Sequence, residues 1–212
     1  MWIVLTSLIA VCAFTLSFLF QRAGFTFNND PLLFSCLYLL TSISMIRASG
    51  EMEFALQFEN WGLWSFTICY VLASAFILVA YNQRHPVDPE FVSSNPAAFY
   101  LNFNIGFAIS KFSDIVFQLV FAAIIYMYVY RVTQNINITV FIFFVLFVSG
   151  HSLLIYTHGP ISFAHIIGAA VGGIVFPILM FRFAQFLPVL ITVHWTFYIV
   201  ARIFVPLVSN SR

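Results

Sequence analysis

The chain carries very little charge for its length. Only 7% of its 212 residues are charged, eight Lys and Arg against seven Asp and Glu. Soluble domains carry about a quarter, so there is too little charged surface to keep a globule of this size in water. The two signs nearly balance and form no basic stripe, which excludes nucleic acid as an electrostatic partner.

Cysteine is equally scarce. Cys12, Cys36 and Cys69 are the three in the chain, an odd number without CxxC spacing. This pattern predicts neither a disulfide framework nor a thiolate metal site. Each cysteine lies in an apolar run, so we expect three small buried apolar side chains.

Apolar residues make up most of the chain. They are 62% of the chain, and the mean hydropathy is +1.01. A helix needs about 20 apolar residues to cross the hydrocarbon layer, and backbone groups in lipid must pair within their own segment. We therefore predict an all-α polytopic transmembrane bundle, a single domain over 1–212 with about seven spans. The predicted spans are 2–20, 31–46, 61–81, 97–131, 138–156, 161–182 and 185–208.

The span at 97–131 is long enough for two interpretations. It is either one long tilted helix that projects from the bilayer, or two short spans with a turn near Phe112. The arginines at the ends of the spans divide equally between the two sides, so they predict no orientation. The first apolar run begins at Trp2 without a basic leader. Together with the 28 Phe residues, this indicates a protein made and inserted within an organelle or a bacterium.

Ionisable residues at membrane depth need an explanation because burying them is costly. Lys111 and Asp114 are three apart on one helical face, and we interpret them as an ion pair. A proton or ion relay needs further carboxylates at depth. The other predicted spans contain none, which argues against an ion-coupled transporter.

The histidines allow a cofactor hypothesis. His151 and His165 are fourteen residues apart, a spacing seen in membrane cytochromes b, but a second pair is missing. Gly159-Pro160 breaks any helix that would align these two with His158. We therefore favour hydrogen-bonded core histidines, His194 included, and expect no haem or metal bound by this chain. Hydrolase motifs around the same residues are incomplete.

Small residues predict a helix contact near the C-terminus. Gly168 and Gly172 are four apart in an apolar run, a small-xxx-small pattern that lets another helix approach closely. We interpret them as packing residues.

Several of these residues resemble cytochrome c oxidase subunit III. That family has a His-x-x-x-Gly-small element followed by an Arg in its sixth helix, and a Trp-rich signature in its seventh. The matching residues here are His165, Gly168 and Arg182 for the sixth helix, and Trp195 and Phe197 for the seventh. Asn102 resembles a residue at the opening of the family's fourth helix. The segment from Arg47 to Gly62-Leu63 resembles the one that leads into its third helix.

The departures are specific. The tryptophan pair of the family's second helix is missing. The carboxylate of its third helix falls near Ser74, and the His and Asp of its last helix are replaced by Thr196 and Ile199. The resemblance implies a core oxidase subunit that binds no haem or metal itself. Such a subunit packs against subunits I and II, which carry haem a and copper, retains phospholipid in a cleft and supports proton uptake. The localisation expected from the resemblance is the mitochondrial inner membrane, ahead of a bacterial inner membrane.

Three other identities stay open. Arg131 and Asn135, followed by Gly150-His151, resemble the essential helix of ATP synthase subunit a. The distance along the sequence from Arg131 to Gly150-His151 is, however, about twice what that family requires. A proton-channel role needs Arg131 at mid-membrane depth. The chain could also be an accessory membrane subunit of another respiratory complex, or an unrelated transporter.

Overall fold

The computed structural model describes residues 2–50, 57–87, 90, 103–152 and 163–209. These residues form seven α-helices and no strand, which confirms the predicted all-α bundle. Asn102, His158 and Gly159-Pro160 lie outside the described residues. The helices are α1 (Trp2–Arg22), α2 (Pro31–Ser49), α4 (Trp61–Arg84), α6 (Ile105–Thr133), α7 (Ile136–Ser152), α9 (Phe163–Arg182) and α10 (Phe186–Ser209).

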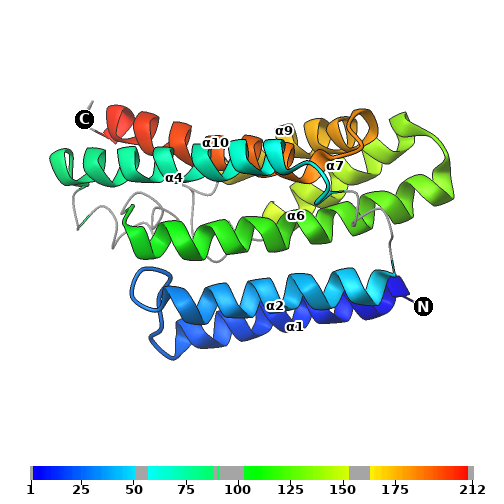
Figure 1. Ribbon diagram of the computed structural model, residues 1–212, viewed down its shortest axis with the longest axis horizontal. Coiled ribbons are helices and arrows are strands. Elements are labelled where there is room, and N and C mark those ends of the chain that lie inside the picture. Colours follow the sequence, from blue (N-terminus) through cyan, green and yellow to red (C-terminus); the bar gives the residue numbers. More distant parts are fainter. Residues whose placement is uncertain (1, 51–56, 88–89, 91–102, 153–162, 210–212) are drawn as a thin grey trace.

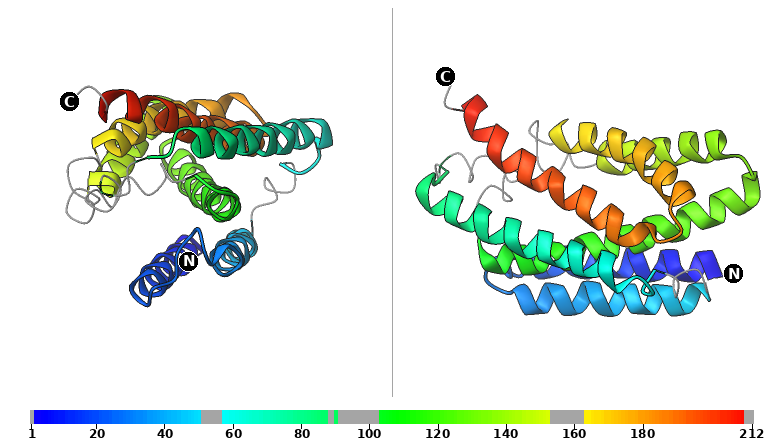
Figure 2. Two further views of the ribbon diagram at one scale, coloured as in Figure 1. Left: turned by 90° about the vertical axis from the view of Figure 1, so that its left-hand side faces the viewer. Right: turned by 45° about the horizontal axis from the view of Figure 1, so that its top comes forward.

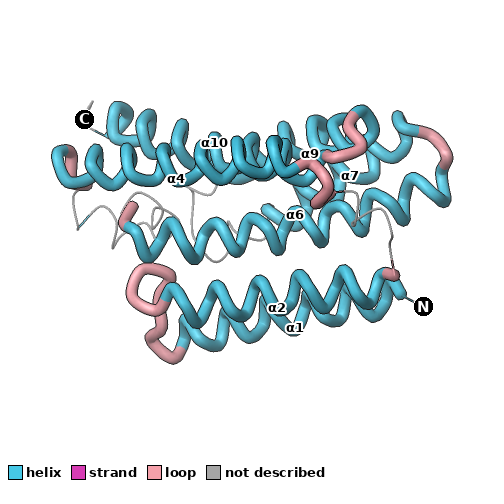
Figure 3. Tube along the Cα trace, viewed as in Figure 1, coloured by secondary structure: helices cyan, strands magenta, loops and turns pink. Residues whose placement is uncertain are grey.

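The helices lie roughly along one direction in three layers (Figures 1 and 2). The antiparallel pair α1 and α2 forms one layer, α6 forms the middle one, and α4, α7, α9 and α10 form the third. The closest packing joins α2 to α6 and α7 to α9. Short loops connect α1 to α2, α6 to α7 and α9 to α10 (Figure 3). The middle helix α6 is the most buried of the long helices.

The protein is an integral membrane protein of about seven spans. Six helices are long and apolar enough to cross a bilayer, and the seventh, α7, is an apolar helix of 17 described residues. Their outward faces carry large apolar side chains, among them Leu32, Trp61 and Ile77. Such faces suit lipid or a partner helix.

Four helices continue further than the sequence predicts. Arg22, Arg47, Arg84 and Arg131 each lie in the last turn of a helix, where a cation interacts favourably with the unpaired carbonyls. The first three lie two, one and three residues beyond the predicted spans 2–20, 31–46 and 61–81. The segment at 97–131 is one continuous helix from Ile105 onward, so the alternative with a turn near Phe112 is wrong.

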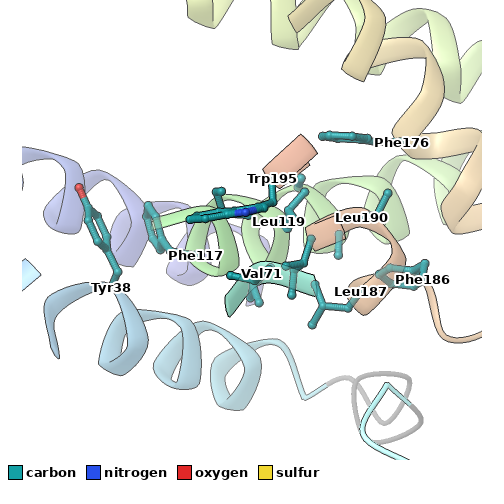
Figure 4. Close-up of a cluster of buried hydrophobic side chains, with 14 of the residues drawn as sticks. Tyr38, Val71, Phe117, Leu119, Phe176, Phe186, Leu187, Leu190 and Trp195 are labelled. Carbon is teal, nitrogen blue, oxygen red and sulfur yellow. The ribbon is translucent and has the colours of Figure 1, made fainter. Parts of the chain in front are cut away.

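Hydrogen bonds hold α10 against α4. The indole N–H of Trp195, which is fully buried, donates to Ser74 Oγ at 2.8 Å. The Tyr70 and Thr196 hydroxyls lie 2.7 Å apart one turn away. Figure 4 shows Trp195 inside the apolar cluster with Val71 of α4 and Leu119 of α6. These bonds satisfy polar groups that lipid cannot.

The three cysteines contradict the expected burial. Cys12, Cys36 and Cys69 are free and exposed on the outer faces of α1, α2 and α4. An apolar run establishes that a residue lies at membrane depth, but not which face of the helix it occupies.

Candidate functional site

A large cavity lies within the bundle. Its volume is about 1090 Å³, and side chains from α1, α6, α7, α9 and α10 line it, together with Phe27 and Tyr38. Most of the lining is apolar or aromatic. Ligand sites are typically cavities of about this size with a few placed polar groups, so this cavity is the candidate site.

The cavity is open towards the side of the bundle. Among the described helices, α1 packs closely against α2 and α6 and has no comparable contact with α7, α9 or α10. The residues Phe14, Phe18, Ile167 and Val171, from α1 and α9, line the cavity and are also exposed. We call these four residues the cavity mouth. Because these four side chains are apolar, the mouth suits contact with hydrocarbon better than contact with water.

An ion pair lies at the inner side of the cavity. The Lys111 ammonium group contacts Oδ2 of Asp114, as their spacing predicts, and both residues are buried, with 6% and 4% of their surface exposed. The amide of Gln118 donates to Asp114 Oδ1 at 2.9 Å. We call Lys111, Asp114 and Gln118 the polar floor. It has no net charge.

Two tyrosines border the polar floor. The Tyr198 ring lies under the Lys111 ammonium, which is 4.8 Å from the ring centroid. The Tyr38 hydroxyl lies 2.7 Å from the Ser17 hydroxyl, and both residues line the cavity. The cavity wall therefore offers several hydrogen-bonding groups at the depth of the ion pair.

The histidines in the described part of the chain do not form a ligand set. His151 Nδ1 lies 2.9 Å from the Phe147 carbonyl oxygen of its own helix. His194 stacks on Tyr198, with centroids 5.7 Å apart, and its buried Nδ1 has no hydrogen-bond partner among the described residues. His165 lies beside Phe197. Within the described part of the chain, no three His, Cys, Asp or Glu side chains come close enough together to hold a metal ion.

The glycines of α9 contact different neighbours. A Cβ at Gly168 would lie 2.8 Å from the Phe197 ring of α10, so this glycine permits the α9–α10 contact. A Cβ at Gly172 would meet only Phe176 of its own helix, at an ordinary 3.5 Å. A Cβ at Gly173 would lie 2.8 Å from the Phe144 Cα atom of α7. The close approach expected at Gly172 therefore occurs at Gly173, on the α7 side.

The other candidate residues are distributed over the bundle. Arg182 is exposed at the end of α9, and Trp195 lies in the core against α4. Neither lines the cavity. Comparison with known proteins identifies no relative: no family model, curated protein or solved structure matches the chain.

Sequence reasoning missed one buried charge. Arg202 is fully buried on α10, and its guanidinium donates to Asn82 Oδ1 at 2.6 Å and to the His85 carbonyl at 2.8 Å. It also lies 5.1 Å from the Tyr81 ring centroid. Arg202 thus binds the C-terminal end of α4, where carbonyls lack helical partners. The sequence does contain a sign of this contact, because an arginine inside an apolar run, like Lys111, needs a partner that offsets the cost of burying its charge.

Proposed function

We propose that the chain is a non-catalytic membrane subunit of a respiratory terminal oxidase, similar to cytochrome c oxidase subunit III. In this proposal it packs against the catalytic subunits I and II, which carry haem a and copper, in the mitochondrial inner membrane. It holds phospholipid in a cleft and supports proton uptake by its partner.

The observation that carries the proposal is the laterally open cavity. The resemblance implies a lipid-retaining cleft between helices, and the cavity has the size and the apolar mouth that an acyl chain needs. Arg22 lines the same cavity at the end of α1, where a cation can meet a phosphate group.

The positions aligned by the resemblance supply further support. Gly168 and Phe197, from two separate motifs, meet in the α9–α10 contact. Ser74 and Thr196 depart from the family, which has ionisable residues at these positions, and do not support the resemblance; both bond across the α4–α10 contact. The neutral side chains thus occupy neighbouring sites on facing helices, which makes this contact a packing element in the present chain.

The ATP synthase alternative loses its main support. Arg131 is exposed and lies in the last turn of α6. A channel arginine has to face its partner helices at mid-membrane depth, and a residue one turn from a helix end does not lie there.

Purification of the native assembly tests the proposal. A tagged chain would be extracted from its host membrane in mild detergent, and the complex analysed for haem, copper and phospholipid. We expect haem a and copper in fixed stoichiometry with the tag. Recovery with a ring of ATP synthase c subunits, or as a solitary monodisperse protein, would contradict the proposal. As a control, an Arg131→Ala chain should co-purify with the same partners.

A further inference from the structure

The polar floor is not explained by a bound phospholipid. A phospholipid keeps its headgroup at the membrane surface, so only an acyl chain would reach Lys111, Asp114 and Gln118. Asp114 lies nine residues after the start of α6, which at 1.5 Å per residue is about 14 Å along the helix. If α6 enters the hydrocarbon layer at its first turn, this is about half of a layer roughly 30 Å thick. A hydrocarbon chain at this depth leaves polar groups without partners.

The polar floor has no net charge, which favours a neutral ligand. The Lys111 ammonium and the Asp114 carboxylate neutralise each other, so neither an anion nor a cation gains net attraction there. One hydrogen-bond donor remains on Lys111, because its ammonium group has three N–H bonds, of which one goes to Asp114 and one to the Tyr198 hydroxyl. His194 adds an imidazole that forms no hydrogen bond with a described residue. A ligand that accepts hydrogen bonds without carrying charge suits these donors.

Aromatic side chains form the cavity wall beside the polar floor and favour a ligand with a planar ring. Phe147, Phe176, His194 and Tyr198 form a continuous series of ring contacts, with successive centroids 5.9, 5.9 and 5.7 Å apart. All four residues line the cavity. Flat π-systems stack on or against such rings. A ring with acceptor oxygens would contact this wall and the donors of the floor together.

We propose that the cavity binds a lipid-soluble quinone. Its ring lies against the polar floor and the aromatic wall, and its apolar tail leaves through the mouth between α1 and α9. This inference concerns a ligand of this chain alone, and in it the quinone competes with the phospholipid of the proposed function for the same cavity.

Photolabelling tests the site. The full chain would be placed in nanodiscs of saturated phosphatidylcholine and exposed to a benzoquinone with a decyl chain and a photoreactive azide. Peptide mapping should find the label on α6 and α10, near Lys111 and His194, and unlabelled quinone should compete. Label confined to other helices, or a cavity that keeps phosphatidylcholine under excess quinone, would overturn the proposal.

Matched variants locate the entry. Val171→Trp fills the mouth and should lower labelling at least about tenfold, whereas Ile174→Trp, on an exposed part of α9 that does not line the cavity, should leave it unchanged. Equal labelling of both variants refutes entry between α1 and α9.

A second variant examines the floor. Lys111→Met combined with Asp114→Asn removes the charges while keeping the volume, and should weaken quinone binding about tenfold, as expected for a lost hydrogen bond to a charged group. Unchanged affinity in this folded variant would show that the floor does not contact the ligand.

Discussion

The buried ion pair gives the sharpest test of the packing in the middle layer. In Lys111→Met, Asp114 would stay buried in α6 with the Gln118 amide as its one remaining described side-chain partner. Breaking a buried pair in this way costs about 3–5 kcal/mol, because it leaves an uncompensated charge. We therefore expect the free energy of unfolding to fall by that amount.

The double variant distinguishes the interaction between Lys111 and Asp114 from the effect of changing each residue alone. When Lys111→Met is combined with Asp114→Asn, no charge is left, and the new amide can still bond to Gln118. Replacing a whole buried pair is often neutral, so the double variant should lie within about 1.5 kcal/mol of the wild type. The coupling energy between the two positions is then a few kcal/mol, well above the error of such cycles.

The assay is reversible unfolding in mixed micelles, followed by the fluorescence of the four tryptophans. Val132→Met, at the exposed end of the same helix, serves as a control and should change stability by less than about 0.5 kcal/mol. Strictly additive effects of Lys111→Met and Asp114→Asn would refute the ion pair.

Three further substitutions test helix contacts by the same assay. Gly173→Ala should destabilise by about 1–3 kcal/mol, because its Cβ meets the α7 backbone, whereas Gly172→Ala should be tolerated; equal effects would contradict this packing. Gly106→Ala should lower the free energy of unfolding still more, since its Cβ would overlap the backbone carbonyl of Asn28, in the loop before α2. A stable variant would disprove that contact. Trp195→Phe should cost about 1–3 kcal/mol by leaving Ser74 without its indole donor, and no loss would argue against the bond.

The sequence was sufficient to predict the class of fold and most of the helices. Long apolar runs have one solution in lipid, and markers such as Pro31 and Trp61 stand at helix starts in the structure. At their C-terminal ends α1, α2, α4 and α6 continue two or three residues past the predicted spans. An arginine reads as a loop residue by its charge, yet the carbonyls of a last helical turn accept it well, as at Arg22 and Arg84.

The cavity could not be predicted in the same way. It depends on which faces of five helices meet, and neighbouring residues of a helix point about 100° apart. Gly172 and Gly173 illustrate this, because one faces Phe176 of its own helix and the other the backbone of α7. Lys111 and Asp114 were predicted as a pair because their interaction lies within a single helix. Their position in a cavity wall is a property of the tertiary packing.

Topology mapping tests the central claim, a bundle whose helices cross the membrane alternately. In a chain with Cys12, Cys36 and Cys69 replaced by Ala, single cysteines would be placed at Arg22, Arg84, Arg131 or Arg182 and labelled with an impermeant maleimide in sealed vesicles. The structure predicts that the first two positions react from one side and the last two from the other. Reaction of all four from the same side would contradict the fold in the membrane.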